Sequence, residues 1–190
     1  LSSEDQAEIQ QENADVEFGY FVDTVISDTP SAIRVFSQTK DISTFELVSG
    51  ALPTKSNEVA LAQTMADQYK IGDTIRLNES GKSTLLKEHE FTITGFVQSS
   101  EILSNTIKGV SSAGSGDLSG FAVVPKDAFD SEVYTIARLR YPDLRKWKTT
   151  IREYSDKVVE LQQALEEKLA DNGTARLDAL KTTADDKISE

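Results

Sequence analysis

The 190-residue sequence contains no cysteine and a single histidine, His89. Without thiols the chain can form no disulfide, no thiolate zinc site and no cysteine nucleophile. One imidazole cannot build a histidine-rich metal site, and the charged residues that flank His89 are typical of a solvated strand edge. A general base also needs a nucleophile, and the sequence nominates none. We therefore predict no catalytic residue, no metal site and no cofactor.

Long hydrophobic runs are also missing. No stretch of about 18 apolar residues is present, so no segment is predicted to span a membrane. No signal peptide is recognisable either. Because the chain starts at Leu1 without a methionine and stops at Glu190 within a helical pattern, we expect it to be a fragment of a longer protein. The remaining parts of that protein could include membrane segments.

The sequence contains fewer basic than acidic residues. The 20 lysines and arginines face 32 acidic residues, which gives a net charge of -12. A surface of this sign repels phosphate backbones and anionic lipids, so nucleic acid is not an expected partner. The acidic residues are scattered and contain no Asp-x-Asp-x-Asp-Gly loop for calcium. We expect them to keep the surface soluble.

What the sequence does contain is a succession of short β-branched and aromatic segments separated by turns. Strands are predicted over residues 16–26, 32–38, 58–61, 74–77, 89–99 (with a bulge at Gly95), 121–125 and 134–141. A polar helix over residues 4–12 precedes them, with Ser3 as its N-cap and Gln6 completing a capping box. A short helix is expected over residues 62–69. Because strands follow one another across short turns, residues 1–143 are predicted to form an α+β core with a mixed or mainly antiparallel sheet.

From Leu144 onward the apolar residues are spaced alternately by three and four. The positions that share this spacing are Leu144, Trp147, Ile151, Tyr154, Val158, Leu161 and Leu165. Such a seam is typical of a coiled coil, so residues 144–190 are predicted to form a helical coiled-coil arm. Asn172-Gly173 predicts the end of its first helix, and helical spacing resumes at Leu177. We expect the arm to dock near Trp147 and then to leave the core as a stiff rod.

One short stretch resembles a nucleotide site. Gly81-Lys82-Ser83 matches the end of a phosphate-binding loop, which needs another glycine five residues earlier and a helix after the loop. Arg76 occupies the position of that first glycine, and a strand pattern follows within a few residues. Residues 78–81 fit a hairpin turn better. We predict that the chain does not bind ATP.

Two further groups of residues could contact a ligand. Gly114-x-Gly116 is followed by Ser119 where a dinucleotide fingerprint needs a third glycine, so residues 109–120 are predicted to be a mobile surface loop. Aromatic residues on the predicted strands could line a groove, but strand aromatics more often belong to the core. We assign to the core Phe18, Tyr20, Phe21, Phe45, Phe91 and Phe96.

The segment that begins at Gly50 carries a family resemblance. Its pattern, Gly-x-Leu-Pro followed by Glu-Val-Ala-Leu and then by Ile-Gly-Asp-Thr-Ile, resembles the extracytoplasmic domain of FtsX-like ABC transporter permeases, also called the MacB-like periplasmic core. The residues that carry the pattern are Gly50, Leu52, Pro53, Glu58, Gly72 and Asp73. The resemblance covers about residues 1–141, without the first strand of the family's domain. Residues 144–190 resemble the coiled-coil extension of large Gram-positive members.

These motif residues are expected to have structural roles. Gly50, Pro53 and Gly72 are predicted to shape turns. Glu58 is expected to anchor a loop or a strand end, and Asp73 to cap a turn or accept hydrogen bonds from turn amides. None of them is expected to take part in catalysis.

The resemblance implies that a separate cytoplasmic ABC subunit hydrolyses ATP and that the permease conveys the conformational change across the cell membrane. This domain would then lie on the extracellular face and act on a lipid, a peptide or a protein partner such as a wall hydrolase. The alternative is an acidic cell-surface binding module that captures a cationic peptide or protein, for which the net charge of -12 is a hint. An enzyme is disfavoured, because no nucleophile–base pair or metal cluster is recognisable.

Overall fold

The computed structural model describes residues 1–79, 84–102, 109–111, 113–150 and 152–189. The chain divides into two compact units. The sheet unit is Glu17–Arg138, and the helical unit combines Leu1–Val16 with Leu139–Glu190. The first sixteen residues therefore group with the C-terminal segment. The sequence had instead predicted a core of residues 1–143 followed by an arm of residues 144–190.

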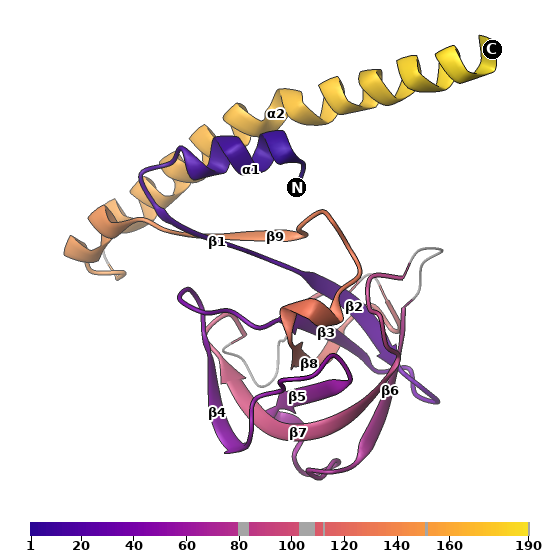
Figure 1. The fold of residues 1–190 in the computed structure, drawn as a ribbon. Helices are drawn as coiled ribbons and strands as arrows, with labels where there is room; N and C mark the ends of the chain where they lie inside the picture. The colour runs from indigo at the N-terminus through magenta and orange to yellow at the C-terminus, as the bar shows by residue number, and fades with distance from the viewer. Residues whose placement is uncertain (80–83, 103–108, 112, 151, 190) are drawn as a thin grey trace. The chain divides into compact units, whose positions relative to one another are not determined.

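Seven strands of the sheet unit form one mixed sheet (Figure 1). In spatial order they are β4 (Phe45–Gly50), β7 (Glu90–Ser99), β5 (Glu58–Ala62), β8 (Leu118–Val124), β3 (Ala32–Ser37), β2 (Phe21–Ile26) and β6 (Thr74–Glu79). The β3–β8 and β5–β7 pairs are parallel, and the other pairs in this sheet are antiparallel. Strand β6 also pairs with β7, so six of the strands close into a ring of pairings. The predicted mixed α/β character is confirmed.

Strand β7 is the centre of this arrangement because it has three partners. Strand β5 pairs along one of its edges, from Thr92 to Val97. Along the other edge, β6 pairs with the first residues of β7 and β4 with the last. The register along β5 skips Thr94, which confirms the irregularity predicted at Gly95. The bulge therefore lies where the end of β4 and the start of β6 meet.

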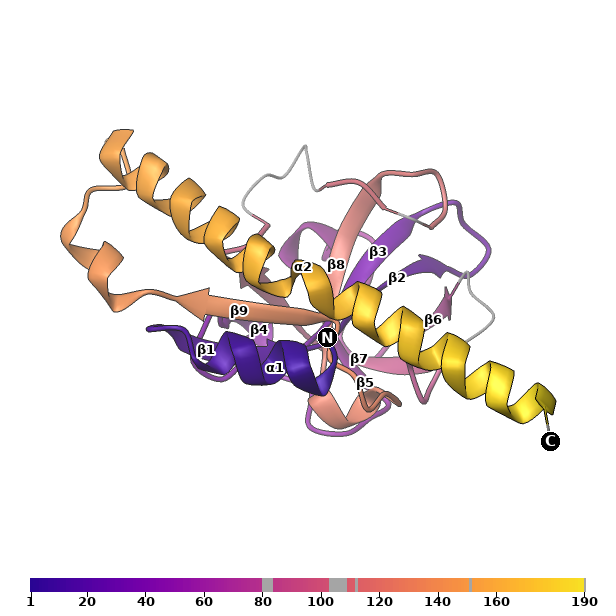
Figure 2. The same cartoon turned by 90° about the horizontal axis from the view of Figure 1, so that it is seen from above.

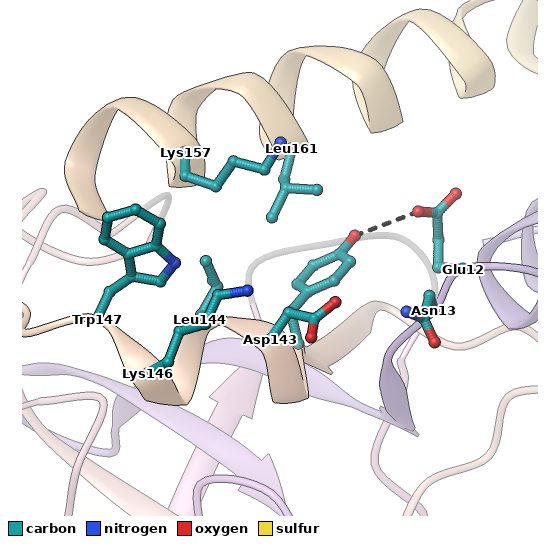
Figure 3. Close-up of a pocket in the computed structure, with 9 residues that line it drawn as sticks. Glu12, Asn13, Asp143, Leu144, Lys146, Trp147, Lys157 and Leu161 are labelled. Carbon is teal, nitrogen blue, oxygen red and sulfur yellow. Dashed lines mark hydrogen bonds between the residues drawn. The ribbon is translucent and has the colours of Figure 1, made fainter. Parts of the chain in front are cut away.

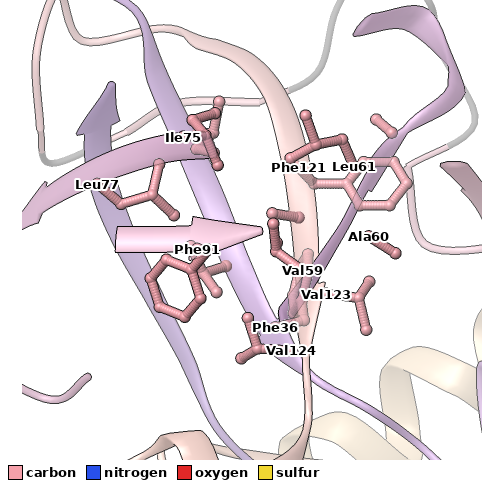
Figure 4. Packing of buried hydrophobic residues seen from close by; sticks show 14 of the residues in the cluster. Phe36, Val59, Ala60, Leu61, Ile75, Leu77, Phe91, Phe121, Val123 and Val124 are labelled. Atoms are coloured by element: carbon pink, nitrogen blue, oxygen red, sulfur yellow. The ribbon is translucent and has the colours of Figure 1, made fainter. Parts of the chain in front are cut away.

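The core lies between the inward faces of these strands, and β3, β5 and β8 are buried along most of their length. The first residues of β7 alternate instead, since Phe91 and Ile93 are buried while Glu90 and Thr92 are exposed. Figure 4 shows Phe91 packed with Leu77, Val59 and Val124 from other strands. Of the aromatics assigned to the core, four are buried and two, Phe18 and Phe21, are half-buried; the four are Tyr20, Phe45, Phe91 and Phe96.

The N-terminal helix α1 (Ser3–Gln10) begins one residue earlier than expected. Its N-cap is Ser2, not Ser3, and the capping box is completed by Asp5, not Gln6. The Ser2 hydroxyl accepts a hydrogen bond from the Asp5 amide at 3.1 Å, and the Asp5 carboxylate accepts one from the Ser2 amide at 2.7 Å. A carboxylate is the stronger acceptor at the positive end of a helix, which explains why this register is preferred.

The strand predicted over residues 16–26 is two strands. They are β1 (Asp15–Gly19), which pairs with β9 (Ile136–Arg140), and β2, which pairs with β3 and β6. The break lies at Tyr20, whose backbone exchanges hydrogen bonds with Ser37. A Cβ atom on Gly19 would approach the Ser37 hydroxyl to 2.9 Å. The end of β1 can therefore pass this close to Ser37 only because residue 19 is a glycine.

Other boundaries also differ from the prediction. The helix expected over residues 62–69 is only a 3-10 turn, η1 (Gln63–Met65), and a second such turn is η2 (Lys126–Ala128). Strand β8 begins at Leu118, within the segment predicted to be a loop. Residues 110 and 117 form an isolated antiparallel bridge in front of it, so that loop is partly hydrogen-bonded.

The C-terminal segment differs most from the prediction. Leu144 lies in a 3-10 helix, η3 (Pro142–Lys146), and Trp147 is extended, so neither belongs to the long helix α2 (Arg152–Ser189). Helix α2 also does not end at Asn172-Gly173 but continues through it. The seam position Ile151 lies outside the described residues, and Tyr154, Val158, Leu161 and Leu165 are half-buried on α2.

Helix α1 lies alongside α2 within the helical unit, as both Figure 1 and Figure 2 show. The Asn172 amide of α2 donates to the carboxylates of Asp5 and Glu8, both at 2.9 Å. Lys168 donates to the Glu8 carbonyl at 3.0 Å and to the Glu12 carboxylate at 2.9 Å. These bonds give a physical reason why the helix end predicted at Asn172-Gly173 does not form, because the Asn172 side chain binds α1 rather than capping α2.

Candidate functional site

The predicted nucleotide-like stretch cannot be placed, because Gly81-Lys82-Ser83 lies outside the described residues. Strand β6 ends just before it, at Glu79, whose carboxylate accepts hydrogen bonds from the amides of Leu85 and Leu86. The turn and the lack of ATP binding stay predictions. Two other places hold the residues singled out from the sequence: the bulge of β7 and a groove in the helical unit.

The motif residues at Gly50 and Gly72 converge on the bulge of β7. The amide of Ala51 donates to the Thr94 carbonyl at 2.9 Å, and the Thr94 hydroxyl donates back to the Ala51 carbonyl at 3.0 Å. From the second turn, the Gly72 amide donates to the Ile93 carbonyl at 2.8 Å. Two segments that are about twenty residues apart in sequence thus bind neighbouring residues of one strand.

The two motif glycines are needed for different reasons. Gly50 has φ +79°, and a Cβ atom there would lie 2.3 Å from the Thr94 carbonyl oxygen. Gly72 has φ +95°, but a Cβ atom there would meet no other atom within 4 Å. Both glycines adopt left-handed backbone conformations, and only Gly50 also requires the close approach of two chain segments.

Glu58 holds the loop that precedes β5. Its carboxylate accepts hydrogen bonds from the Thr54 amide at 2.9 Å, the Thr54 hydroxyl at 3.1 Å and the Lys55 amide at 3.2 Å. The bond from the Thr54 backbone, together with those from Lys55, lowers the pKa of Glu58 from 4.5 to about 2. The expected anchoring role of this residue agrees with these contacts.

The remaining motif residues are also engaged in turns or lie at the surface. The Asp73 carboxylate accepts a hydrogen bond from the Lys70 amide at 2.9 Å, as expected for a turn acceptor. The Pro53 carbonyl accepts one from the Gln38 side chain at 3.0 Å. Leu52 is 38% exposed, and Ile71, which precedes Gly72 in the second part of the motif, is 49% exposed. The motif glycines therefore support the β7 bulge, while Glu58, Asp73 and Pro53 hold the turns next to it.

The second place is a groove of about 280 Å³ within the helical unit. One side of the groove is lined by the segment that contains η3, and the other side by Lys157 and Leu161 from the first turns of α2. Apolar contacts are supplied by Leu144 and Trp147 from the first segment and by Leu161 from α2. Figure 3 shows Leu161 reaching down from α2 toward Leu144, with Trp147 at one end of the groove.

Polar residues line the rest of this groove. Glu12 and Asn13, which follow α1, lie at the end opposite Trp147 (Figure 3). The dashed line in that figure marks the hydrogen bond from the Tyr141 hydroxyl to the Glu12 carboxylate, at 3.4 Å. Burial, followed by the charge of Glu12, raises the pKa of the Tyr141 phenol. The groove thus has an apolar end and a polar end.

Two of the four charged residues in the groove already have partners. Glu12 is paired with Lys168 at 2.9 Å, and Lys157 is paired with Glu160 at 2.6 Å. The other two are Asp143 and Lys146, whose side chains make no hydrogen bond or ion pair with any residue that the structure describes. They are three residues apart in η3, a spacing that places side chains on the same face of a 3-10 helix.

The structure brings three of the predicted seam residues together in a way the sequence did not indicate. Leu144, Trp147 and Leu161 line one groove, although only Leu161 belongs to a helix that continues the seam. Sequence reasoning missed the polar members of the groove. Pro142, at the start of η3, was the available signal that a helical turn begins before Leu144.

Within the described ranges, no group of three or more histidine, cysteine or acidic residues is arranged to hold a metal ion. No helix among those residues has the length and apolar character needed to cross a membrane. No protein-family model matches the chain, and no curated protein matches it in sequence.

Proposed function

We propose that the chain is the extracellular domain of an FtsX-like ABC transporter permease and that α2 acts as its rigid arm. In this role a separate cytoplasmic subunit hydrolyses ATP, and the permease conveys the conformational change to the outer face of the cell membrane. The domain then works on an extracellular lipid, peptide or protein. The motif that carries the resemblance supports this proposal, since its two turn segments, at Gly50 and Gly72, both bind the bulge of β7.

The observation that carries the arm proposal is the continuity of α2. The helix has 38 residues, which corresponds to a length of about 57 Å. It runs through Asn172-Gly173, where a helix end would have produced a flexible joint. A stiff rod can transmit a displacement that a flexible linker would absorb.

The MacB-like core and the coiled coil are the finer parts of the same proposal. In it, Tyr154, Val158, Leu161 and Leu165 form the seam of α2, and α1 is one of the elements that covers this helix. No nucleic acid and no cofactor belongs to the proposed role. The ATPase subunit binds through membrane segments of the full-length protein.

The alternative role, an acidic module that captures a cationic peptide, has weaker support. It relies on the net charge of -12. However, the carboxylates of Asp5, Glu8 and Glu12 already accept hydrogen bonds inside the helical unit. Carboxylates that are used in this way attract a cationic partner less strongly than free ones would.

A proline in the exposed part of α2 tests the arm role. Thr174→Pro removes one helical hydrogen bond and bends the rod just after Gly173, at a cost of about 3 kcal/mol. In the full-length protein reconstituted with its ATPase subunit, ATP hydrolysis should persist while the transport-linked activity is lost. Thr174→Ala is the matched control and should keep both activities.

Full transport-linked activity in the Thr174→Pro protein would contradict the arm role. The binding-module alternative makes a different prediction. It expects saturable binding of polylysine by the isolated chain in calorimetry, unchanged by Thr174→Pro. Absence of the ATPase subunit from the purified full-length protein would argue against the permease assignment itself.

A further inference from the structure

The groove of the helical unit contains two unpaired charges of opposite sign beside an apolar wall. Asp143 and Lys146 both line it, and neither is paired with a residue that the structure describes. Trp147, Leu144 and Leu161 supply the wall. From this arrangement we propose that the groove binds a small zwitterion with a large apolar side chain, of the class of a free apolar or aromatic amino acid.

The sign of the charges selects the class of ligand. A purely cationic ligand would meet Lys146, and a purely anionic one would meet Asp143, so each would gain one attraction and suffer one repulsion. A ligand with both an ammonium and a carboxylate can satisfy both residues. The partners of the other two charged residues, Glu160 for Lys157 and Lys168 for Glu12, leave Asp143 and Lys146 as the groups that a ligand can engage.

The wall and the size of the groove select the rest of the molecule. A volume of about 280 Å³ lies near the lower limit of small-molecule pockets, which favours a ligand of amino-acid size. Trp147 is 38% exposed, so its indole offers a face that a ligand side chain can cover. Figure 3 shows Asp143 and Leu144 between Trp147 at one end and Asn13 at the other, so charged and apolar contacts lie within one site.

The composition of the chain provides a specific reporter. Trp147 is the only tryptophan, so the indole emission of the full chain comes from the groove alone. The probe is L-phenylalanine, with excitation chosen for tryptophan. Covering the indole should shift its emission to shorter wavelength, saturably, with a dissociation constant of about 1 mM.

Three related compounds test each part of the ligand. Phenethylamine lacks the carboxylate, 3-phenylpropanoate lacks the ammonium, and glycine lacks the side chain. Each should bind about tenfold more weakly than phenylalanine, because each leaves one groove residue or the wall without its partner.

Variants of the two charged residues test the same assignment from the protein. Lys146→Met should weaken phenylalanine about tenfold but should not weaken phenethylamine, because it removes the charge that repels that cation. Asp143→Asn should weaken phenylalanine to a similar extent but should not weaken 3-phenylpropanoate, because it removes the charge that repels that anion. Matched controls are Lys148→Met and Asp171→Asn, exposed residues outside the groove lining, which should bind like the unmodified chain.

Circular dichroism shows whether each variant keeps its helix, so a loss of binding can be separated from a loss of fold. The proposal is overturned if phenylalanine produces no saturable change up to about 20 mM, some twentyfold above the expected constant. Equal affinity for phenylalanine and the three compounds would overturn it too, because the charges and the wall would then not be used together. The proposal would also be overturned if phenylalanine bound to Lys146→Met and Asp143→Asn as tightly as to the two control variants.

Discussion

The sheet unit and the helical unit are stabilised by different kinds of contact. The hydrophobic clusters of buried side chains lie in the sheet unit, between Tyr20 and Phe129. Among the side chains described in the helical unit, Ile9 is the one apolar residue that is buried. There, α1 is held to α2 by hydrogen bonds and ion pairs from Lys168 and Asn172.

This difference predicts that the two units differ in stability. Apolar burial contributes a large part of the folding free energy and is not screened by salt. Partly exposed polar contacts each contribute little and are weakened by salt. We therefore expect the sheet unit to unfold as a cooperative block and α1 to separate from α2 at a much lower cost.

Truncation of the core should have the largest effect. Phe91→Ala removes a side chain that is 0% exposed, and we expect the sheet unit to lose about 3–5 kcal/mol of unfolding free energy. Urea denaturation followed by circular dichroism of the strands measures the loss. Leu177→Ala, on an exposed part of α2, is the control and should change the value by less than about 0.5 kcal/mol. Similar losses in the two variants would remove the distinction between the units.

The two motif glycines should differ from each other. Gly50→Ala combines a positive φ with a clash against the Thr94 carbonyl, so it should destabilise the sheet unit by at least about 2 kcal/mol. Gly72→Ala has the positive φ but open space, so about 1 kcal/mol is expected. The same urea experiment compares them. A Gly72 variant as unstable as the Gly50 variant would show that backbone conformation alone explains the motif.

The polar contact between α1 and α2 should respond more weakly. Lys168→Met removes the bonds to the Glu8 carbonyl and the Glu12 carboxylate. Hydrogen exchange of the α1 amides should then become about fivefold faster, while the amides of the sheet core keep their protection. Thr174→Ala is the control on the same helix. Unchanged exchange in α1 would mean that Ile9, rather than the polar contacts, holds the helix.

The smallest effect is the pH dependence contributed by Glu58. The pKa of Glu58 is lowered from its ordinary value of 4.5 to about 2. Its hydrogen bonds therefore stabilise the folded state fully above pH 4.5, and this stability is lost as the pH falls from about 4.5 toward 2. Glu58→Gln should therefore be less stable than the unmodified chain at pH 6, and the difference should disappear near pH 2. Urea midpoints measured over this range check the prediction. A difference that grows on acidification would have the wrong sign.

The sequence was sufficient for most of the strands, because alternation and β-branched content are local signals. Strand β6 and the first residues of β7 show the alternation directly, and the Gly95 irregularity could be predicted from the residue type alone. The closure of the strands through β6 and β7 could not, because it depends on contacts between distant segments. The roles of Gly50 and Glu58 were predictable as turn and anchor, although their partners were not.

The helical unit shows where local signals fail. Asn172-Gly173 is a strong helix-end signal, but the side chain of Asn172 binds α1 instead, and the expected end does not form. The 3,4 spacing counted Leu144 and Trp147 as helical, but the chain there forms a 3-10 helix and then extends. The groove combines residues that follow α1 with residues of η3 and α2, so no window of sequence contains it.

The proposed transmission through α2 is tested most directly by a distance measurement in the full-length protein. Because this chain contains no cysteine, single cysteines introduced at Thr182 on α2 and at Glu88 in the sheet unit can carry nitroxide labels without background from this domain. Pulsed electron resonance then gives the distance distribution between the labels, in the complex with the ATPase subunit, before and after trapping with ATP and vanadate. We predict that the distribution shifts on trapping and that Thr174→Pro broadens it and removes the shift. Superimposable distributions in the free and trapped states would contradict the role of α2 as an arm that transmits the conformational change.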